Sequence, residues 1–148
     1  MDIGETAPDF ELAADDGRKV KLSDELAKGP VVLFFYPKAL TSGCTRESCH
    51  FRDLASEFAA AGAQRIGISA DSVDRQRKFS EKHSFDFTLL SDPDRTVARQ
   101  FGVKRPGPLF NKRVTFVIDT DRRVLDVIRS ETNMETHADQ ALATLAKR

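Results

Sequence analysis

Short hydrophobic runs alternate along this chain with polar stretches that contain glycine and proline. Residues 30–37, PVVLFFYP, form a continuous apolar run between two prolines, which predicts a central strand buried on both faces. Shorter runs predict strands at RIGISA, FTLL, RVTFVIDT and RVLDVIR, with DTDRR as a tight hairpin between the last two. Near the N-terminus, DFELAADDGRKVKLSDEL predicts two short strands around an Asp-Asp-Gly turn.

Apolar residues spaced three and four positions apart predict helices between these runs. The clearest case extends from Thr41 to Gly62, where Phe51 and Phe58 lie on one face and Gly62 stands where a C-terminal cap belongs. Three further helices are predicted at SVDRQRKFSEKH, at DRTVARQFG and over about residues 135–145. The alternation of strands and helices predicts one domain over residues 1–148, with a central mixed sheet and helices on both faces. This order suits a thioredoxin-like α/β fold.

Composition and charge narrow the possible partners and the compartment. The 23 basic and 23 acidic side chains cancel, so bulk charge does not favour nucleic acid. The start, MDIGETAPDF, lacks the features of a signal peptide, and the longest apolar stretch, VVLFFY, is too short to span a bilayer. We therefore expect a cytoplasmic protein without a membrane partner, whose two cysteines are reactive or buried thiols and not a permanent disulfide.

Both cysteines lie in the segment TSGCTRESCH, residues 41–50. Thr41 and Ser42 are candidate N-caps, which places Cys44 in the first turn of a helix directly after the buried strand. Free backbone N–H groups and the positive end of the helix dipole favour a thiolate there. Cys44 is therefore a candidate nucleophile, with its side chain facing the protein body.

Cys49 occupies a different face of the predicted helix. It lies about 140° further around the axis, and the two Cα atoms are roughly 8.7 Å apart in an ideal helix. A disulfide requires less than about 7 Å between Cα atoms. If Cys44 and Cys49 pair, the helix must therefore unwind locally.

The segment FFYPKALTSGCTRESCHFRDLASEF resembles the active-site region of the peroxiredoxins, and the spacing of its second cysteine resembles the Q-type, or bacterioferritin comigratory protein, subfamily. GETAPDFEL, GISAD, FTLLSD and KRVTFVID extend the resemblance over nearly the whole chain. It implies that Cys44 is the peroxidatic cysteine, Cys49 the resolving cysteine, and Thr41 and Arg113 active-site residues. Ser42 departs from the pattern, because the family usually has proline there.

The resemblance further implies a thioredoxin-dependent peroxidase for hydrogen peroxide and organic hydroperoxides, more often a monomer than a homodimer. Thr41, Arg113 and the backbone N–H groups of Gly43 and Cys44 would surround the peroxide oxygens. A sulfenic acid on Cys44 would condense with Cys49, and thioredoxin or a similar dithiol would reduce the disulfide. No metal or organic cofactor is required.

Each assignment has a simpler alternative. Thr41 could be only a helix cap, and Arg113 only a surface ion-pair residue. Glu47 fits compensation of the helix dipole better than acid catalysis, and it could also hold an arginine in place. A metal site at the cysteines and the adjacent histidine is disfavoured, because their spacing matches no common zinc pattern. The other two histidines lie in polar parts of the sequence that indicate no functional role.

The sequence also fits other functions for the loop and for the two cysteines. The basic loop GVKRPGPLFNKR, residues 102–113, could be a solvated connection, a pocket wall or a partner contact. A thioredoxin-like disulfide oxidoreductase would be expected to show Cys-x-x-Cys, whereas four residues separate these cysteines. A non-enzymatic redox sensor would use the same two thiols, and only turnover would distinguish it from an enzyme.

Overall fold

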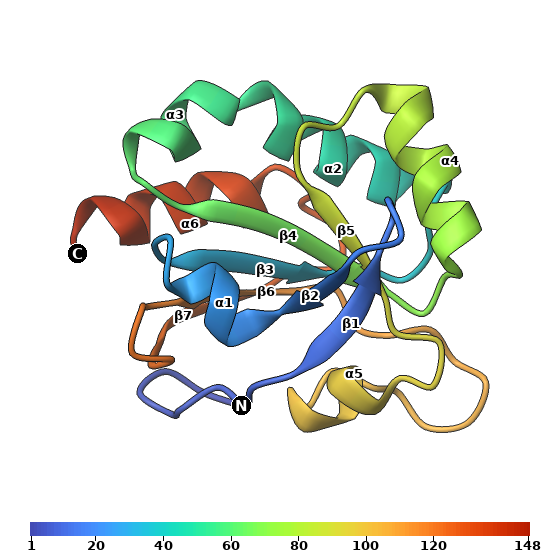
Figure 1. Ribbon diagram of the computed structural model, residues 1–148, viewed down its shortest axis with the longest axis horizontal. Coiled ribbons are helices and arrows are strands. Elements are labelled where there is room, and N and C mark those ends of the chain that lie inside the picture. Colours follow the sequence, from blue (N-terminus) through green and yellow to red (C-terminus); the bar gives the residue numbers. More distant parts are fainter.

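A computed structural model describes residues 1–148 and contains a seven-stranded mixed sheet in the order β2-β1-β5-β4-β3-β6-β7 (Figure 1). The strands are Glu11–Ala14 (β1), Lys19–Lys21 (β2), Val31–Phe35 (β3), Gln64–Ser69 (β4), Thr88–Ser91 (β5), Val114–Ile118 (β6) and Val124–Arg129 (β7). β3 pairs in parallel with β4, which pairs in parallel with β5, whereas β6 is antiparallel to β3 and β7 to β6. The predicted mixed, thioredoxin-like sheet is confirmed.

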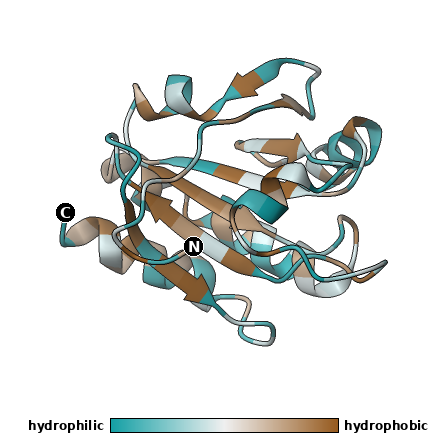
Figure 2. Cartoon of the chain, turned by 90° about the horizontal axis from the view of Figure 1, so that it is seen from below, coloured by the Kyte–Doolittle hydropathy of each residue, from teal (hydrophilic) through white to brown (hydrophobic).

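The strand β3 is central because every one of its five residues is buried. Its side chains alternate between two hydrophobic cores, one on each face of the sheet. Val31, Leu33 and Phe35 join one core, and Val32 and Phe34 join the other. Figure 2 shows this arrangement as hydrophobic colour concentrated along the inner strands.

Helices cover both faces of the sheet, as predicted. They are Leu22–Leu26 (α1), Ser42–Asp53 (α2), Ala55–Ala60 (α3), Val73–His83 (α4), Thr96–Gln100 (α5) and Thr136–Ala146 (α6). In Figure 1, α2, α3, α4 and α6 lie above the sheet, and α1 and α5 lie on its opposite side. The core between the sheet and α2, α3, α4 and α6 contains Cys44, Phe51 and Phe58. Helix α2 therefore places Cys44 against the sheet.

Two predictions of local structure were wrong. The predicted helix from Thr41 to Gly62 is interrupted at Leu54, which has φ −96° and ψ 23°, and continues as α3. No glycine or proline marks the break, and Phe51 and Phe58 pack on either side of it with ring centroids 5.6 Å apart, so the apolar spacing continues through it. Near the N-terminus, the end of the second predicted strand is instead α1, a five-residue helix with two buried leucines.

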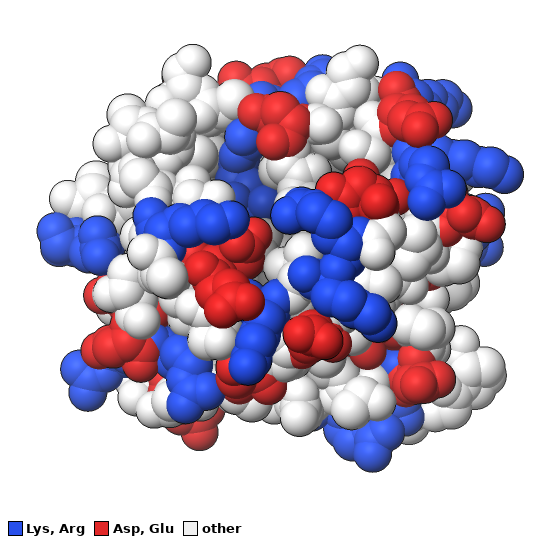
Figure 3. Space-filling view, viewed as in Figure 1, with Lys and Arg blue, Asp and Glu red and all other residues white.

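Charged side chains of both signs are interspersed over the face shown in Figure 3. This mixture agrees with the balanced composition and forms no broad surface of one sign on that face. None of the helices combines the length and the apolar character that crossing a bilayer would require.

Candidate functional site

The turn between β3 and α2 sets the position of the first cysteine. Leu40 in this turn has φ 67°, a conformation that residues with a side chain rarely adopt. Asp71, just after β4, holds the turn by accepting a hydrogen bond from the Ala39 N–H at 2.7 Å. Arg75 donates to Asp71 Oδ1 and to the Ala39 carbonyl, each at 3.0 Å. The turn before α2 is thus held by residues 32 and 36 positions beyond Ala39.

Thr41 occupies the N-cap position of α2, but its side chain does not cap the helix. Its hydroxyl donates to the Lys38 carbonyl at 2.7 Å, and its own carbonyl accepts the Thr45 N–H at 2.9 Å. Thr41 is therefore the N-cap residue, as predicted, but its hydroxyl bonds to the Lys38 carbonyl within the tight turn and not to an N–H group of the helix. Ser42 is the first helical residue, a position where proline is also favoured and where neither residue needs an intrahelical partner for its N–H group.

Cys44 lies in the first turn of α2 and is only 1% exposed. Arg113, immediately before β6, donates from Nη2 to Cys44 Sγ at 3.3 Å and from Nη1 to Glu47 Oε1 at 2.6 Å. Two donors of one guanidinium plane therefore contact the cysteine and the glutamate that follows it by one helical turn. The structure brings Cys44, Glu47 and Arg113 together as one buried cluster. Arg113 is not a surface ion-pair residue.

The electrostatics of this cluster follow from its burial. Glu47 is completely buried, and this burial raises its pKa to about 8, although the Arg113 charge opposes the shift. Burial works against the charged form of Arg113, but the charges of Glu47 and Cys44 outweigh it and raise the pKa of the guanidinium. Removing Glu47 would leave a buried donor of Arg113 without its acceptor, which lies 2.6 Å away. Glu47 therefore holds an arginine in place, which was one of its two predicted roles.

His137, which the sequence pattern did not indicate, is fully buried on α6 next to this cluster. Its Nδ1 lies 2.8 Å from Thr115 Oγ1 and 3.6 Å from Glu47 Oε2, and its Nε2 lies 2.8 Å from the Ser130 carbonyl. Burial lowers the pKa of His137. The polar residues around it in the sequence suggested a surface position, whereas its alignment with the buried Ala141 and Leu145 at four and eight positions was the available signal.

Cys49 is half-buried, and its burial raises the pKa of its thiol against the opposing charge of Arg52. Both cysteines are free thiols, and α2 is continuous from Ser42 to Asp53. Cys44 belongs to the hydrophobic core over the sheet, whereas Cys49 is outside it. The predicted separation of the two thiols on an intact helix is confirmed for this state.

The second half of α2 is held to three neighbouring elements. His50 Nε2 lies 2.7 Å from Asp139 Oδ1 on α6. Arg52 donates to the His83 carbonyl at the end of α4 at 2.7 Å, and Arg65 of β4 donates to the Phe51 carbonyl at 2.8 Å. These three contacts, which we call the α2 tethers, all begin after Cys49.

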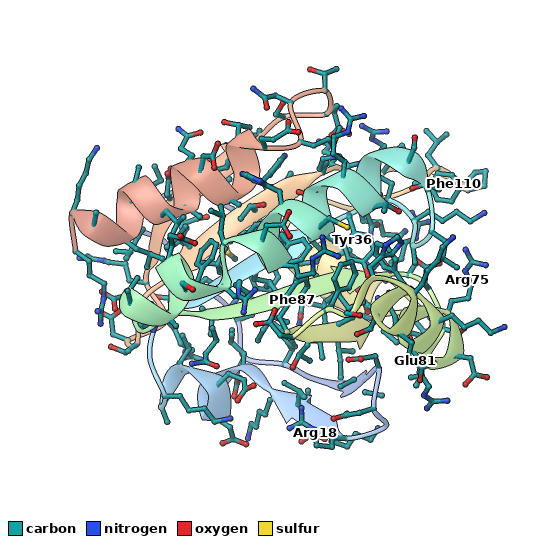
Figure 4. All side chains as sticks on the ribbon, turned by 90° about the horizontal axis from the view of Figure 1, so that it is seen from above. Arg18, Tyr36, Arg75, Glu81, Phe87 and Phe110 are labelled. Carbon is teal, nitrogen blue, oxygen red and sulfur yellow. The ribbon has the colours of Figure 1, made fainter.

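The loop at residues 102–112 is organised by Arg95, which has φ 55° and donates to three of its carbonyls. Leu109 and Phe110 remain 55% and 53% exposed, and the Lys38 ammonium lies 5.7 Å from the Phe110 ring centroid. The loop lines a cavity of about 200 Å³ together with Pro37 and Ala70. Figure 4 shows Phe110 beyond the start of α2, and Tyr36 between α2 and α4. This cavity is lined by none of Thr41, Cys44 and Arg113, so the three interpretations of the loop all stay predictions.

Several donors near Cys44 have no partner within the protein. The helical hydrogen bonds of α2 begin at the Thr45 N–H, so the N–H groups of Gly43 and Cys44 are not used by that pattern. The Nε of Arg113 is also buried without a hydrogen-bond partner. A side-chain methyl on Gly43 would come within 3.3 Å of Arg113 Nη2, so glycine permits this close approach. The site therefore combines a nucleophilic sulfur with uncommitted donors, the arrangement needed to stabilise a developing oxyanion.

No group of three histidine, cysteine or acidic residues in the chain is arranged to hold a metal ion. The adjacent pair Cys49 and His50 diverges, because His50 points to α6.

Comparison with known proteins places the chain in a family. The model of the AhpC/TSA family matches residues 3–127. A protein of Mycobacterium tuberculosis that carries the name peroxiredoxin is 61% identical over 148 residues, which cover 98% of this chain and 96% of that protein. A match of this extent shows common family membership.

Two solved structures agree with this relationship. The crystal structure of peroxidoxin BcpB from Mycobacterium tuberculosis has a TM-score of 0.97 and 59% identity, covering 99% of this chain and 97% of the other. Bacterioferritin comigratory protein from Xanthomonas campestris has a TM-score of 0.89 and 33% identity, covering 99% of this chain and 98% of the other. The chain therefore belongs to the AhpC/TSA family and, within it, is a Q-type peroxiredoxin of the bacterioferritin comigratory protein group.

Proposed function

We propose that this chain is a thiol peroxidase in which Cys44 reduces hydrogen peroxide and organic hydroperoxides and Cys49 resolves the product. The observation that carries the proposal is the contact between Arg113 Nη2 and Cys44 Sγ, at 3.3 Å, in the first turn of α2. The family provides the reaction class, since the structure of the Xanthomonas relative was determined in the context of alkyl peroxide reduction.

In the first step, the Cys44 thiolate attacks one peroxide oxygen along the O–O axis. The S–O bond forms as the O–O bond breaks, so the sulfur is oxidised to a sulfenic acid and the leaving oxygen takes a proton to become water or an alcohol. Arg113 and the N–H groups of Gly43 and Cys44 stabilise the negative charge on the leaving oxygen. Thr41, whose hydroxyl donates to Lys38, can accept a hydrogen bond from the peroxide hydroxyl through its remaining lone pairs.

In the second step, the Cys49 sulfur attacks the Cys44 sulfenic acid. The S–S bond forms, water leaves, and the two thiols become one disulfide. Because the intact α2 keeps the two cysteines on different faces, this step requires the first turns of α2 to unwind. A dithiol such as thioredoxin then reduces the disulfide and is itself oxidised.

The proposed setting is a monomer in the cytoplasm, where a thioredoxin system keeps both cysteines reduced. Steady consumption of peroxide and NADPH with thioredoxin and its reductase would support an enzyme. Oxidation of one equivalent per protein molecule, with no further consumption, would instead support the redox sensor that uses the same thiols.

Replacing Arg113 with lysine tests the role of the guanidinium fork. Arg113→Lys keeps the positive charge but cannot contact Cys44 and Glu47 together in one plane. We expect kcat/KM for hydrogen peroxide to fall about 100-fold, the typical effect of losing one donor to a developing oxyanion. The matched control is Arg129→Lys, because Arg129 pairs with Asp2 at the exposed surface. A near-normal rate for Arg113→Lys would return this residue to a purely structural role.

A further inference from the structure

Arg113 brings one positive charge into a cluster that contains two acids. Its guanidinium contacts Cys44 on one side and Glu47 on the other, and these three residues are 6%, 1% and 0% exposed. Water screens charges poorly at such depth, so two anions beside one cation are unfavourable. The cluster is electrically balanced with a single anion, which is either the Cys44 thiolate or the Glu47 carboxylate.

His137 lies where it can hold the proton that this balance requires. Its Nε2 is 2.8 Å from the Ser130 carbonyl, which only accepts, so Nε2 carries a hydrogen. Its Nδ1 is 2.8 Å from Thr115 Oγ1 and 3.6 Å from Glu47 Oε2. Glu47 Oε2 is buried and has no hydrogen-bond partner. With a neutral imidazole and an ionised Glu47, neither Nδ1 nor Oε2 would carry a hydrogen, so the buried Oε2 would have no donor.

One proton removes this conflict. Placed on Nδ1 of His137, it is donated to the Thr115 hydroxyl and leaves an ion pair with Glu47 at 3.6 Å. Placed on Oε2 of Glu47, it faces the Nδ1 lone pair, and a modest approach of the two side chains completes a hydrogen bond. Both placements give the pair the same total charge.

We propose that Glu47 and His137 together bind one proton when Cys44 is ionised. His137 thereby acts through Glu47 to favour the thiolate form of Cys44. A proton leaving Cys44 Sγ is then balanced by one on the Glu47–His137 pair. With that proton on Glu47 Oε2, Arg113 has the thiolate as its only anionic partner, and with the proton on His137 Nδ1, the imidazolium balances the Glu47 carboxylate. When the pair loses its proton, the Glu47 carboxylate competes for Arg113 and disfavours the thiolate. This inference rests on the proposed role of Cys44.

The surrounding groups support this assignment. Burial raises the pKa of Glu47 to about 8, so the pair retains its proton at neutral pH and loses it as the pH rises through that value. The charge of Glu131, which follows β7, also raises the pKa of Glu47. Its Oε2 accepts the Arg113 backbone N–H at 2.9 Å and pairs with Arg105 at 3.3 Å, so it already has a cationic partner.

The test follows the thiolate of Cys44 by its ultraviolet absorbance against pH, without peroxide, in a Cys49→Ser background where one thiol titrates. Glu47→Gln keeps an oxygen for Arg113 Nη1 but cannot become an anion. We expect it to move the thiolate midpoint about 1–2 units to lower pH, because the competing carboxylate is gone. His137→Asn should move the midpoint about 1 unit to higher pH, because Glu47 then stays ionised more readily.

A double variant and two further substitutions make the outcome decisive. In a Glu47→Gln background, adding His137→Asn should have no effect on the midpoint, since no carboxyl remains for the histidine to influence. Thr115→Val, which removes the acceptor for a proton on Nδ1, should give a smaller shift to higher pH than His137→Asn. His83→Asn on α4 is the matched control and should leave the midpoint unchanged.

A shift of the Glu47→Gln midpoint to higher pH would overturn the proposal, because it would mean that Glu47 only holds Arg113 in place. The proposal would also be overturned if His137→Asn moved the thiolate midpoint equally in the presence of Glu47 and in the Glu47→Gln background. Failure of the proposed catalytic role is seen separately, as peroxide turnover that survives Cys44→Ser.

Discussion

Cys44→Ser should abolish the peroxidase reaction, with kcat/KM falling at least about 1,000-fold, to the uncatalysed background. The serine hydroxyl fits the space of the thiol but is not ionised near neutral pH, so Arg113 and the helix N-terminus have no nucleophile to stabilise. Consumption of hydrogen peroxide in a coupled thioredoxin assay measures the effect, and thermal unfolding establishes that the variant is folded.

Cys49→Ser is the matched control, since it makes the same substitution at the other cysteine. It should retain the first reaction with peroxide at a normal rate, as measured by rapid mixing with one equivalent. Peroxide turnover by Cys44→Ser, or loss of the first reaction in Cys49→Ser alone, would show that the two cysteines have been assigned to the wrong roles.

Sustained turnover in Cys49→Ser should disappear even though its first reaction is intact. Without a resolving thiol, the Cys44 sulfenic acid persists and is oxidised to sulfinic acid by excess peroxide, unless an external thiol intercepts it. Mass spectrometry should therefore find added oxygen on Cys44 in this variant and a Cys44–Cys49 disulfide in the oxidised wild-type protein. Oxidised wild-type protein without that disulfide would contradict the resolving mechanism.

Amide hydrogen exchange should show the movement that this disulfide requires. Exchange across residues 42–49 should accelerate on oxidation and recover on reduction, whereas α3 should change little. Unwinding loses a few backbone hydrogen bonds, each worth roughly 0.5–1.5 kcal/mol net, which formation of the covalent bond can offset. A disulfide that forms with unchanged exchange over residues 42–49 would mean that the helix accommodates it by another route.

The sequence predicted the sheet well because its strands carry a local signal. The apolar run at β3 is buried along its whole length, and the runs that become β4, β6 and β7 are each bounded by turn residues. The interruption at Leu54 could not be predicted, because the apolar spacing of Phe51 and Phe58 continues through it. Local periodicity reports which residues are buried, and it does not report a change in backbone direction that keeps them buried.

The site was predicted as far as residue type and position in the helix allow. Cys44 at a helix start carries its own chemical signal, and the resemblance to peroxiredoxins indicated Arg113. His137 was missed because its role depends on α6 packing against α2 and β6, a tertiary contact that no local pattern contains. The sequence likewise indicated Thr41 as an N-cap but not that its hydroxyl donates to the Lys38 carbonyl, because that turn is held by Asp71, just after β4.

If the proposed disulfide forms, the α2 tethers would decide which of the two sulfur atoms moves. His50, Phe51 and Arg52 are anchored to three different elements, so Cys49 stays near the fixed end of the helix and Cys44 must come to it. This movement would separate the Cys44 sulfur from the Arg113 guanidinium. In the proposed disulfide form the peroxide site would therefore be disassembled, with neither a free thiolate nor its contact to Arg113. Reduction of the bond would then restore both the thiols and the helix that positions Cys44 beside Arg113.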